Sequence, residues 1–98
     1  MLLVDVLTST LDSLKIIQES IECNEWGNAS AYYEGLCDWY GDILGFIPSE
    51  SPRIGLMVKA LNLLDDAIQS RDSAQAQKNI VEFKLEVEKI QNGFYGLI

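Results

Sequence analysis

The side chains best suited to chemistry in this 98-residue chain are its carboxylates, 15 in all. Glu19 and Glu22 stand three residues apart, which places two carboxylates on adjacent turns of a helix. Glu34, Asp38 and Asp42 follow at four-residue spacing on the next expected helix. Because Mg²⁺ prefers carboxylate oxygens, this pattern predicts one candidate activity, the metal-assisted hydrolysis of a phosphate compound.

These two acidic elements resemble the metal-binding motifs of all-helical nucleotide pyrophosphohydrolases, in which Glu-x-x-Glu and Glu-x-x-Asp face a cleft. Here the second element is Glu-x-x-x-Asp, and Glu34 and Asp38 fall on the side of their helix opposite its apolar stripe. Acidic runs of this kind are usually solvated helix faces. A Mg-dependent nucleotide pyrophosphohydrolase is therefore kept as the third hypothesis for function.

The residue types that most other catalytic mechanisms need are missing. The chain has no histidine, which removes Ser–His and Cys–His nucleophile pairs and histidine metal ligands. It also has no glycine-rich phosphate-binding motif. We therefore expect a protein that is not an enzyme, with no catalytic residues, no cofactor and no metal ligands.

Cys23 and Cys37 are 14 residues apart and do not form a Cys-x-x-Cys pair. Two reduced thiols in a cytoplasmic protein are the simplest interpretation, and a bridge stays open if their Cα atoms lie within about 7 Å. The opening residues 1–5 have no basic region, and no apolar run approaches the ~20 residues of a membrane helix. We expect a cytoplasmic protein with no signal peptide and no membrane contact.

The net charge of −8 lies entirely in the first half of the chain. Residues 1–50 hold nine acids and one base, Lys15, whereas residues 51–98 hold six of each. Nucleic acid and anionic lipid need basic neutralisation, so neither is expected as a partner. The acidic half favours a basic protein partner, and plain solubility is the alternative explanation.

Aromatic residues gather in the same acidic half, between residues 26 and 40. Tyr33 and Tyr40 share the apolar side of their helix, so we expect them in the core. Trp26, Tyr32 and Trp39 flank that side, and large rings with a polar end are common interface anchors. The predicted partner-binding residues are these three rings and the acids around them: Trp26, Tyr32, Trp39, Glu34, Asp38, Asp42, Glu19 and Glu22.

Apolar residues recur at three- and four-residue spacing along four segments, which is typical of amphipathic helices. A chain of this length with 48% hydrophobic residues can support one core. We predict an all-α, single-domain antiparallel four-helix bundle built from two αα-hairpins. The first hairpin covers about residues 1–45, a linker covers about 45–52 and the second hairpin covers about 52–98.

The third segment has the widest apolar arc, so we expect its helix to be the most buried. The other three segments carry narrower stripes. The expected core residues are Leu3, Leu7, Leu14, Ile17, Ile21, Leu36, Ile43, Ile54, Met57, Val58, Leu61, Leu64, Ile68, Ala76, Ile80, Phe83, Val87, Ile90 and Phe94.

Capping residues mark the expected helix boundaries. Asn24 or Asn28 is the predicted N-cap of the second helix. Ser51, followed by proline, is typical of the start of the third helix, and Asp72 or Ser73 caps the fourth.

Val81 and Leu85 form an apolar pair one turn apart, outside the main stripe of the fourth segment. With Leu97 and Ile98 they could make a second apolar patch. A homodimer face is one use for it, and packing by the C-terminal residues of the same chain is the other.

Small size, one-sided charge and the lack of catalytic groups favour an acidic inhibitor, like an immunity protein or an antitoxin, that covers a basic toxin or nuclease. The alternative is an export chaperone or adaptor that holds a partner's amphipathic helix in an apolar groove. The joints at residues 24–26 and 67–72 resemble the helix-turn-helix joints of flagellar and type III export chaperones. The first hypothesis predicts binding that salt weakens steeply, and the second predicts weak salt dependence.

Overall fold

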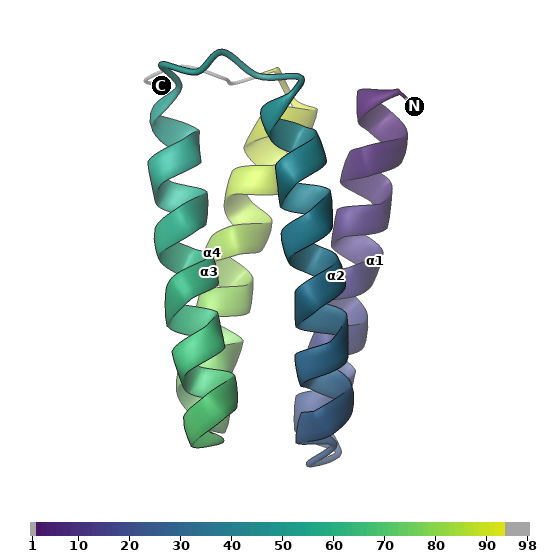
Figure 1. The fold of residues 1–98 in the computed structure, drawn as a ribbon, viewed down its shortest axis with the longest axis vertical. Helices are drawn as coiled ribbons and strands as arrows, with labels where there is room; N and C mark the ends of the chain where they lie inside the picture. The colour runs from purple at the N-terminus through teal and green to yellow at the C-terminus, as the bar shows by residue number, and fades with distance from the viewer. Residues whose placement is uncertain (1, 94–98) are drawn as a thin grey trace.

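The computed structural model describes residues 2–93, and four helices contain most of them. These are α1 (Leu3–Glu22), α2 (Trp26–Leu44), α3 (Pro52–Ser70) and α4 (Ser73–Gln91). Successive helices run antiparallel, and the linker 45–51 crosses one end of the bundle between α2 and α3 (Figure 1). The predicted all-α four-helix bundle is confirmed, with helix boundaries close to those expected.

The four helices pair as two hairpins. α1 packs most extensively along α2, and α3 along α4, whereas the α1–α4 contact is smaller and the α2–α3 contact is the smallest. The remaining pairs, α1 with α3 and α2 with α4, lie diagonally across the bundle (Figure 1). The seam between α2 and α3 is therefore the least closely packed side of the molecule.

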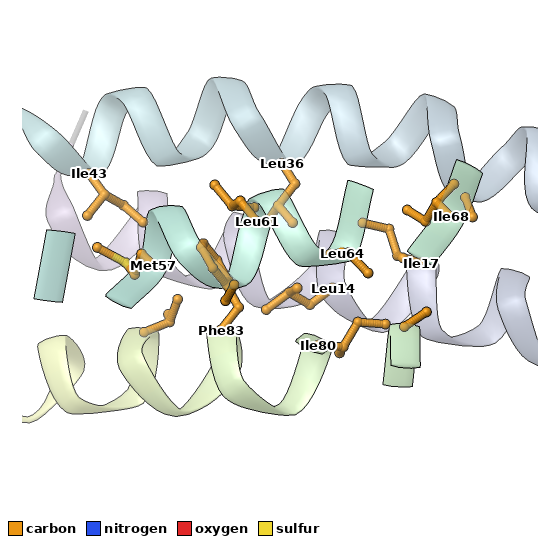
Figure 2. Close-up of a cluster of buried hydrophobic side chains, with 14 of the residues drawn as sticks. Leu14, Ile17, Leu36, Ile43, Met57, Leu61, Leu64, Ile68, Ile80 and Phe83 are labelled. Atoms are coloured by element: carbon orange, nitrogen blue, oxygen red, sulfur yellow. The ribbon is translucent and has the colours of Figure 1, made fainter. Parts of the chain in front are cut away.

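One stripe of apolar side chains from each helix meets at the centre of the bundle (Figure 2). Leu14 and Ile17 of α1 lie in this core with Leu36 of α2, Leu64 of α3 and Phe83 of α4, and none of these five is more than 2% exposed. Fully burying a side chain of this size contributes roughly 1.5–3 kcal/mol to stability. The four stripes therefore fix which side of each helix remains for solvent.

The third helix differs from the expectation that it is the most buried. α1, α3 and α4 each contain seven buried residues, so α3 has no excess. Leu56 and Val58 of α3 are 47% and 37% exposed. The backbone carbonyl of Leu61 accepts a hydrogen bond from α2, which marks the side of α3 that faces α2. Val58 lies about 60° round α3 from Leu61, so Val58 borders the loosely packed α2–α3 seam. The apolar arc of α3 is left uncovered at Val58 because α2 packs against it so sparsely, whereas Leu56 lies about 140° round α3 from Leu61, on the side away from α2.

Two predicted N-caps are confirmed. The Ser51 hydroxyl accepts a hydrogen bond from the backbone N–H of Arg53 at 3.3 Å, with proline at the first helical position of α3. The Asp72 carboxylate accepts from the backbone N–H of Gln75 at 3.1 Å at the start of α4. Both side chains satisfy amide groups that the first helical turn leaves without partners.

The predicted cap of the second helix is wrong. α2 begins at Trp26 with Glu25 in the cap position, and no side chain caps it. Asn24 instead adopts a left-handed conformation, φ 59°, which turns the chain between the helices. Asn28 lies inside α2 and donates from Nδ2 to the Ser20 hydroxyl at 2.7 Å. Each asparagine therefore has a role in the hairpin other than capping.

A buried ion pair joins the start of α3 to α4. The apolar periodicity of the sequence did not indicate it. Arg53 Nη1 donates to Glu86 Oε1 at 2.8 Å, and the Arg53 side chain is only 4% exposed. Glu86 Oε2 also lies 3.7 Å from Lys89 Nζ at the protein surface. Since an uncompensated buried charge is costly, neither Arg53 nor Glu86 can be removed alone without a penalty.

Replacing Arg53 tests this dependence. Arg53→Ala is expected to lower the free energy of unfolding by about 3 kcal/mol, because it leaves Glu86 buried without its main partner. Urea denaturation followed by circular dichroism measures the change. The double change Arg53→Met with Glu86→Leu should recover most of the loss, and Lys89→Ala should cost less than ~1 kcal/mol. A single-site loss no larger than that of Lys89→Ala would contradict the assignment.

Candidate protein-binding surface

Every carboxylate in the first half of the chain is exposed to solvent. The ion pairs among the described residues 2–93 all lie in the second hairpin, where Arg53 and Lys89 meet Glu86. The negative charge of the first hairpin is thus left for solvent or for a partner. The exposed acids are Asp5, Asp12, Glu19, Glu22, Glu25, Glu34, Asp38, Asp42 and Glu50.

Most of these acids lie on one side of the first hairpin. The Ser20–Asn28 hydrogen bond marks where α1 and α2 face each other. On α1, Asp12 lies about 80° round the helix from Ser20, on the side away from the core. On α2, Asp42 and Asp38 lie about 40° and 80° round the helix from Asn28, also away from the core. Carboxylates therefore border the same seam from both helices. We call this surface the acidic face: Asp5, Asp12, Glu19, Glu34, Asp38 and Asp42.

The acidic face contains four of the five acids predicted for partner binding and adds two. Glu22 lies about 60° further round α1 than Glu19, away from the seam with α2. Asp5 and Asp12 were not among the predicted site residues. The signal that could have found them is their seven-residue spacing with Glu19, which keeps all three on one line of α1.

The only base in the first half, Lys15, lies at the edge of the acidic face. Lys15 lines a groove of about 400 Å³ between α1 and α4, together with Lys84 and Ile80 of the second hairpin. Asp12 also borders this groove, at the edge where the two surfaces meet. Lys15 stands three residues after Asp12 and four before Glu19, so it adjoins the α1 part of the acidic face, whereas Glu34, Asp38 and Asp42 on α2 have no base on their own helix.

Several of these acids occupy positions that weaken the helices carrying them. Glu19 and Glu22 lie near the C-terminus of α1, and Asp42 near that of α2, where neither last turn contains a base. A negative charge at this end opposes the helix dipole by typically about 0.3–1 kcal/mol. Asp38 lies one turn from both Glu34 and Asp42, which adds like-charge repulsion. The placement lowers the stability of the free protein.

The predicted aromatic anchors do not lie on one surface. Tyr32 and Trp39 lie within about 40° of Asn28, so both border the α1 side of α2, next to the acidic face. Tyr32 is 39% exposed, whereas Trp39 is half-buried against the core. Trp26 is about 140° round α2 from Trp39 and lies on the α3 side.

Trp26 lines a separate groove in the α2–α3 seam. This groove has a volume of about 190 Å³, and Ile68, Gln69 and Arg71 line its α3 side. The Trp26 ring is half-buried and packs against the core. The lining combines two apolar side chains, Trp26 and Ile68, with polar groups and the positive charge of Arg71, so this groove and the acidic face suit different partners.

Tyr33 holds the loosely packed seam together. Its hydroxyl donates to the backbone carbonyl of Leu61 at 2.9 Å, which links α2 to α3. Burial raises the pKa of Tyr33 above its ordinary value, and the neighbouring Cys37 and the charge of Asp65 add to the shift. Burial likewise raises the pKa of the Cys37 thiol, which makes it a weak nucleophile. Like Tyr40, Tyr33 is half-buried against the core that both were predicted to fill.

The carboxylates do not converge as a metal site would require. Glu22 ends α1, while Glu34 lies about 12 Å along α2 from the first residue of that helix. Residues 2–93 contain no group of three or more acidic or cysteine side chains positioned to hold a metal ion.

Both cysteines are free thiols. Cys23 is exposed beside the α1–α2 turn, and Cys37 is half-buried about 16 Å along α2 from that turn. The bridge left open by the sequence is therefore not formed.

Comparisons with protein-family models, with curated proteins and with solved structures found no match for this chain. Among the described residues, none of the helices combines the length and the apolar character needed to cross a bilayer. The acidic face and the two grooves must therefore be interpreted from their own geometry and charge.

Tyr33→Phe tests the link between α2 and α3. Removing the hydroxyl should lower the free energy of unfolding by about 1 kcal/mol at neutral pH. Because the pKa of Tyr33 is raised in the folded state, the contribution of its hydroxyl is present below about pH 10 and is lost as the pH rises further. The gap between wild type and variant should therefore close in alkali, as measured by denaturation at a series of pH values. Tyr32→Phe is the control, and an equal pH-dependent gap there would contradict the assignment.

Neutralising the acidic face should make the protein more stable. Asp38→Asn with Asp42→Asn is expected to raise the free energy of unfolding by about 0.5–1 kcal/mol at low salt, with the gain fading toward 1 M NaCl. Thermal unfolding at several salt concentrations measures this. The control Asp72→Asn makes the same chemical change at a helix N-terminus, where negative charge is favourable, and should bring no gain. A loss of stability in the double variant would show that these acids support the fold.

Proposed function

We propose that this protein is a non-enzymatic binding domain that neutralises a basic protein, as an immunity protein or antitoxin neutralises a cationic toxin or nuclease. The observation that carries the proposal is the acidic face, which places six exposed carboxylates on a hairpin whose only base is Lys15. A protein surface that normally holds nucleic acid is basic, so its charge is opposite to that of the acidic face and would attract it.

Energetics support a binding role over plain solubility. Solubility requires negative charge on the surface, but it does not require acids at the C-terminal ends of α1 and α2. A basic partner would remove the repulsion between Asp38 and its acidic neighbours and so recover the stability that the free protein lacks. The free energy released on neutralisation would add to the affinity.

Shape and anchors are adequate for a stable complex. Helices of 19 and 20 residues give the first hairpin a length of about 29 Å, which suits a partner footprint of about 800 Å². Tyr32 and Trp39, bordering the acidic face, would supply apolar contact inside the charged surface. We assign Trp26 to the edge of the site or outside it, because it faces α3. We place this role in the cytoplasm, where both thiols would remain reduced.

The test compares two variants of equal net charge. One removes three charges from the acidic face (Glu34→Gln, Asp38→Asn, Asp42→Asn), and the other removes three from the second hairpin (Asp65→Asn, Asp66→Asn, Asp72→Asn). Each immobilised protein is exposed to lysate of the source organism at low and high salt. The proposal expects a basic protein that wild type and the second variant retain at low salt, and that the first variant loses.

The captured protein is then purified and assayed. The proposal requires that one equivalent of wild type inhibits its nuclease or toxic activity, and that the first variant inhibits at least tenfold less. A partner that binds both variants equally, or whose activity the protein leaves unchanged, would overturn the proposal.

The groove at Trp26 supports a second candidate function, an export chaperone or adaptor that holds a partner's amphipathic helix. The groove lies in the α2–α3 seam, where the helices pack least closely, and Trp26 and Ile68 offer apolar contacts there among polar neighbours, so the apolar side of a partner helix could bind at modest cost. This alternative expects binding that survives high salt, is insensitive to the acidic-face variant and is lost in Trp26→Ala.

A further inference from the structure

The outer face of α4 carries an apolar pair that its own bundle does not use. Val81 and Leu85 are 56% and 49% exposed, among the most exposed large hydrophobic side chains described. Both lie about 160° round α4 from Phe83, which is completely buried. They therefore project directly away from the core, where folding gains nothing from them.

Charge favours contact between two copies at α4 and opposes it at the first hairpin. The first half of the chain has nine acids and one base, whereas the second half has six of each. Lys78, Glu82, Lys84 and Glu88 around the apolar pair sum to zero, and Lys89, one turn from Leu85, has its own partner in Glu86 at 3.7 Å. Since α2 lies diagonally opposite α4, copies joined through α4 keep their acidic faces apart.

The order of charges along α4 selects an antiparallel arrangement. A two-fold axis level with Phe83 places Val81 against Leu85 of the partner subunit, because the two positions are equally far from the axis. The same axis places Lys78 level with Glu88 of the partner subunit, since each lies five residues from residue 83. A parallel arrangement would instead stack Lys78 on Lys78 of the partner subunit and repeat each like-charge contact.

Two flanking charges are compatible with this register. Glu82 and Lys84 lie on opposite flanks next to the axis, where each comes near its own counterpart. Each also has an opposite charge one turn away on its own helix, Lys78 for Glu82 and Glu88 for Lys84. The outer ion pairs and the central apolar contact therefore decide the register.

We propose that the outer face of α4 binds a second copy of this chain, antiparallel and two-fold symmetric, through Val81, Leu85 and two ion pairs between Lys78 and Glu88. The surface is self-complementary, as a two-fold interface must be. Its apolar centre is small, so the dimer is reversible and depends on protein concentration.

Sedimentation velocity over a wide range of protein concentrations tests the apolar contact. The average mass of wild type should rise from near 11.0 kDa toward twice that value. Val81→Ser with Leu85→Ser should remain monomeric at every concentration. The control is Val4→Ser, a valine on α1 that is 59% exposed and lies outside the proposed interface, and it should dimerise like wild type.

Charge exchange tests the register. Lys78→Glu alone and Glu88→Lys alone should each weaken the dimer by at least tenfold, because each places like charges level with one another. An equimolar mixture of these two variants should form a heterodimer, since both ion pairs are then restored, one with its original polarity and one reversed. A chain carrying both changes, in which both pairs are reversed, should dimerise again. Lys59→Glu, on α3, is the control for net charge.

Three results would overturn the proposal. Wild type that stays monomeric at every concentration would show that the apolar pair does not bind a second copy. A dimer that persists in the double serine variant would place the interface elsewhere, and a mixture no more dimeric than its components would exclude the antiparallel register. None of these variants alters the acidic face, so inhibition of a basic partner can be measured separately in each.

Discussion

The structure depends on the burial of one apolar stripe from each of four helices. Stripes at helical spacing leave each helix one orientation in which its leucines and isoleucines avoid water. Once Leu14, Leu36, Leu64 and Phe83 meet at the centre, the opposite side of every helix faces solvent. The positions of the acids on α1 and α2 follow from this constraint, because they occupy the sides of these helices that do not enter the core. The surface chemistry is thus determined by the same periodicity that determines the fold.

The two hairpins differ in how they treat charge. The second hairpin balances its acids and bases, buries the Arg53–Glu86 pair and caps both of its helices with side chains. The first hairpin has a single base, Lys15, for its many acids and starts both of its helices without a side-chain cap. Local interactions stabilise the second hairpin and are sparse or adverse in the first. We interpret the second hairpin as the support on which the less stable acidic surface is presented.

The sequence predicted the elements that depend on one residue and its near neighbours. The four stripes, the two-hairpin order and the caps at Ser51 and Asp72 all follow from local spacing and backbone chemistry. The sequence could not indicate that Asn28 would reach Ser20, or that Arg53 would pair with Glu86, because both contacts depend on how helices meet. The site shows the same limit. The stripe of α2 acids was evident from spacing, but whether Trp26 and Trp39 share a surface depends on which neighbour lies on each side of α2. Phe94, Leu97 and Ile98 lie outside the described residues, so predictions about them remain predictions.

The diagonal placement of α2 and α4 separates the α2 part of the acidic face from the outer face of α4, although Asp12 of α1 lines a groove together with Lys84. A contact made through one helix leaves the other uncovered, so self-association and partner binding can occur together. In a dimer joined through α4, the two acidic faces point in different directions and the assembly becomes bivalent. A single partner cannot occupy both faces, but a partner that is itself multimeric, or fixed on a surface, can. The strength with which such a partner binds then depends on the concentration at which this chain dimerises, because only the dimer can engage it at both acidic faces.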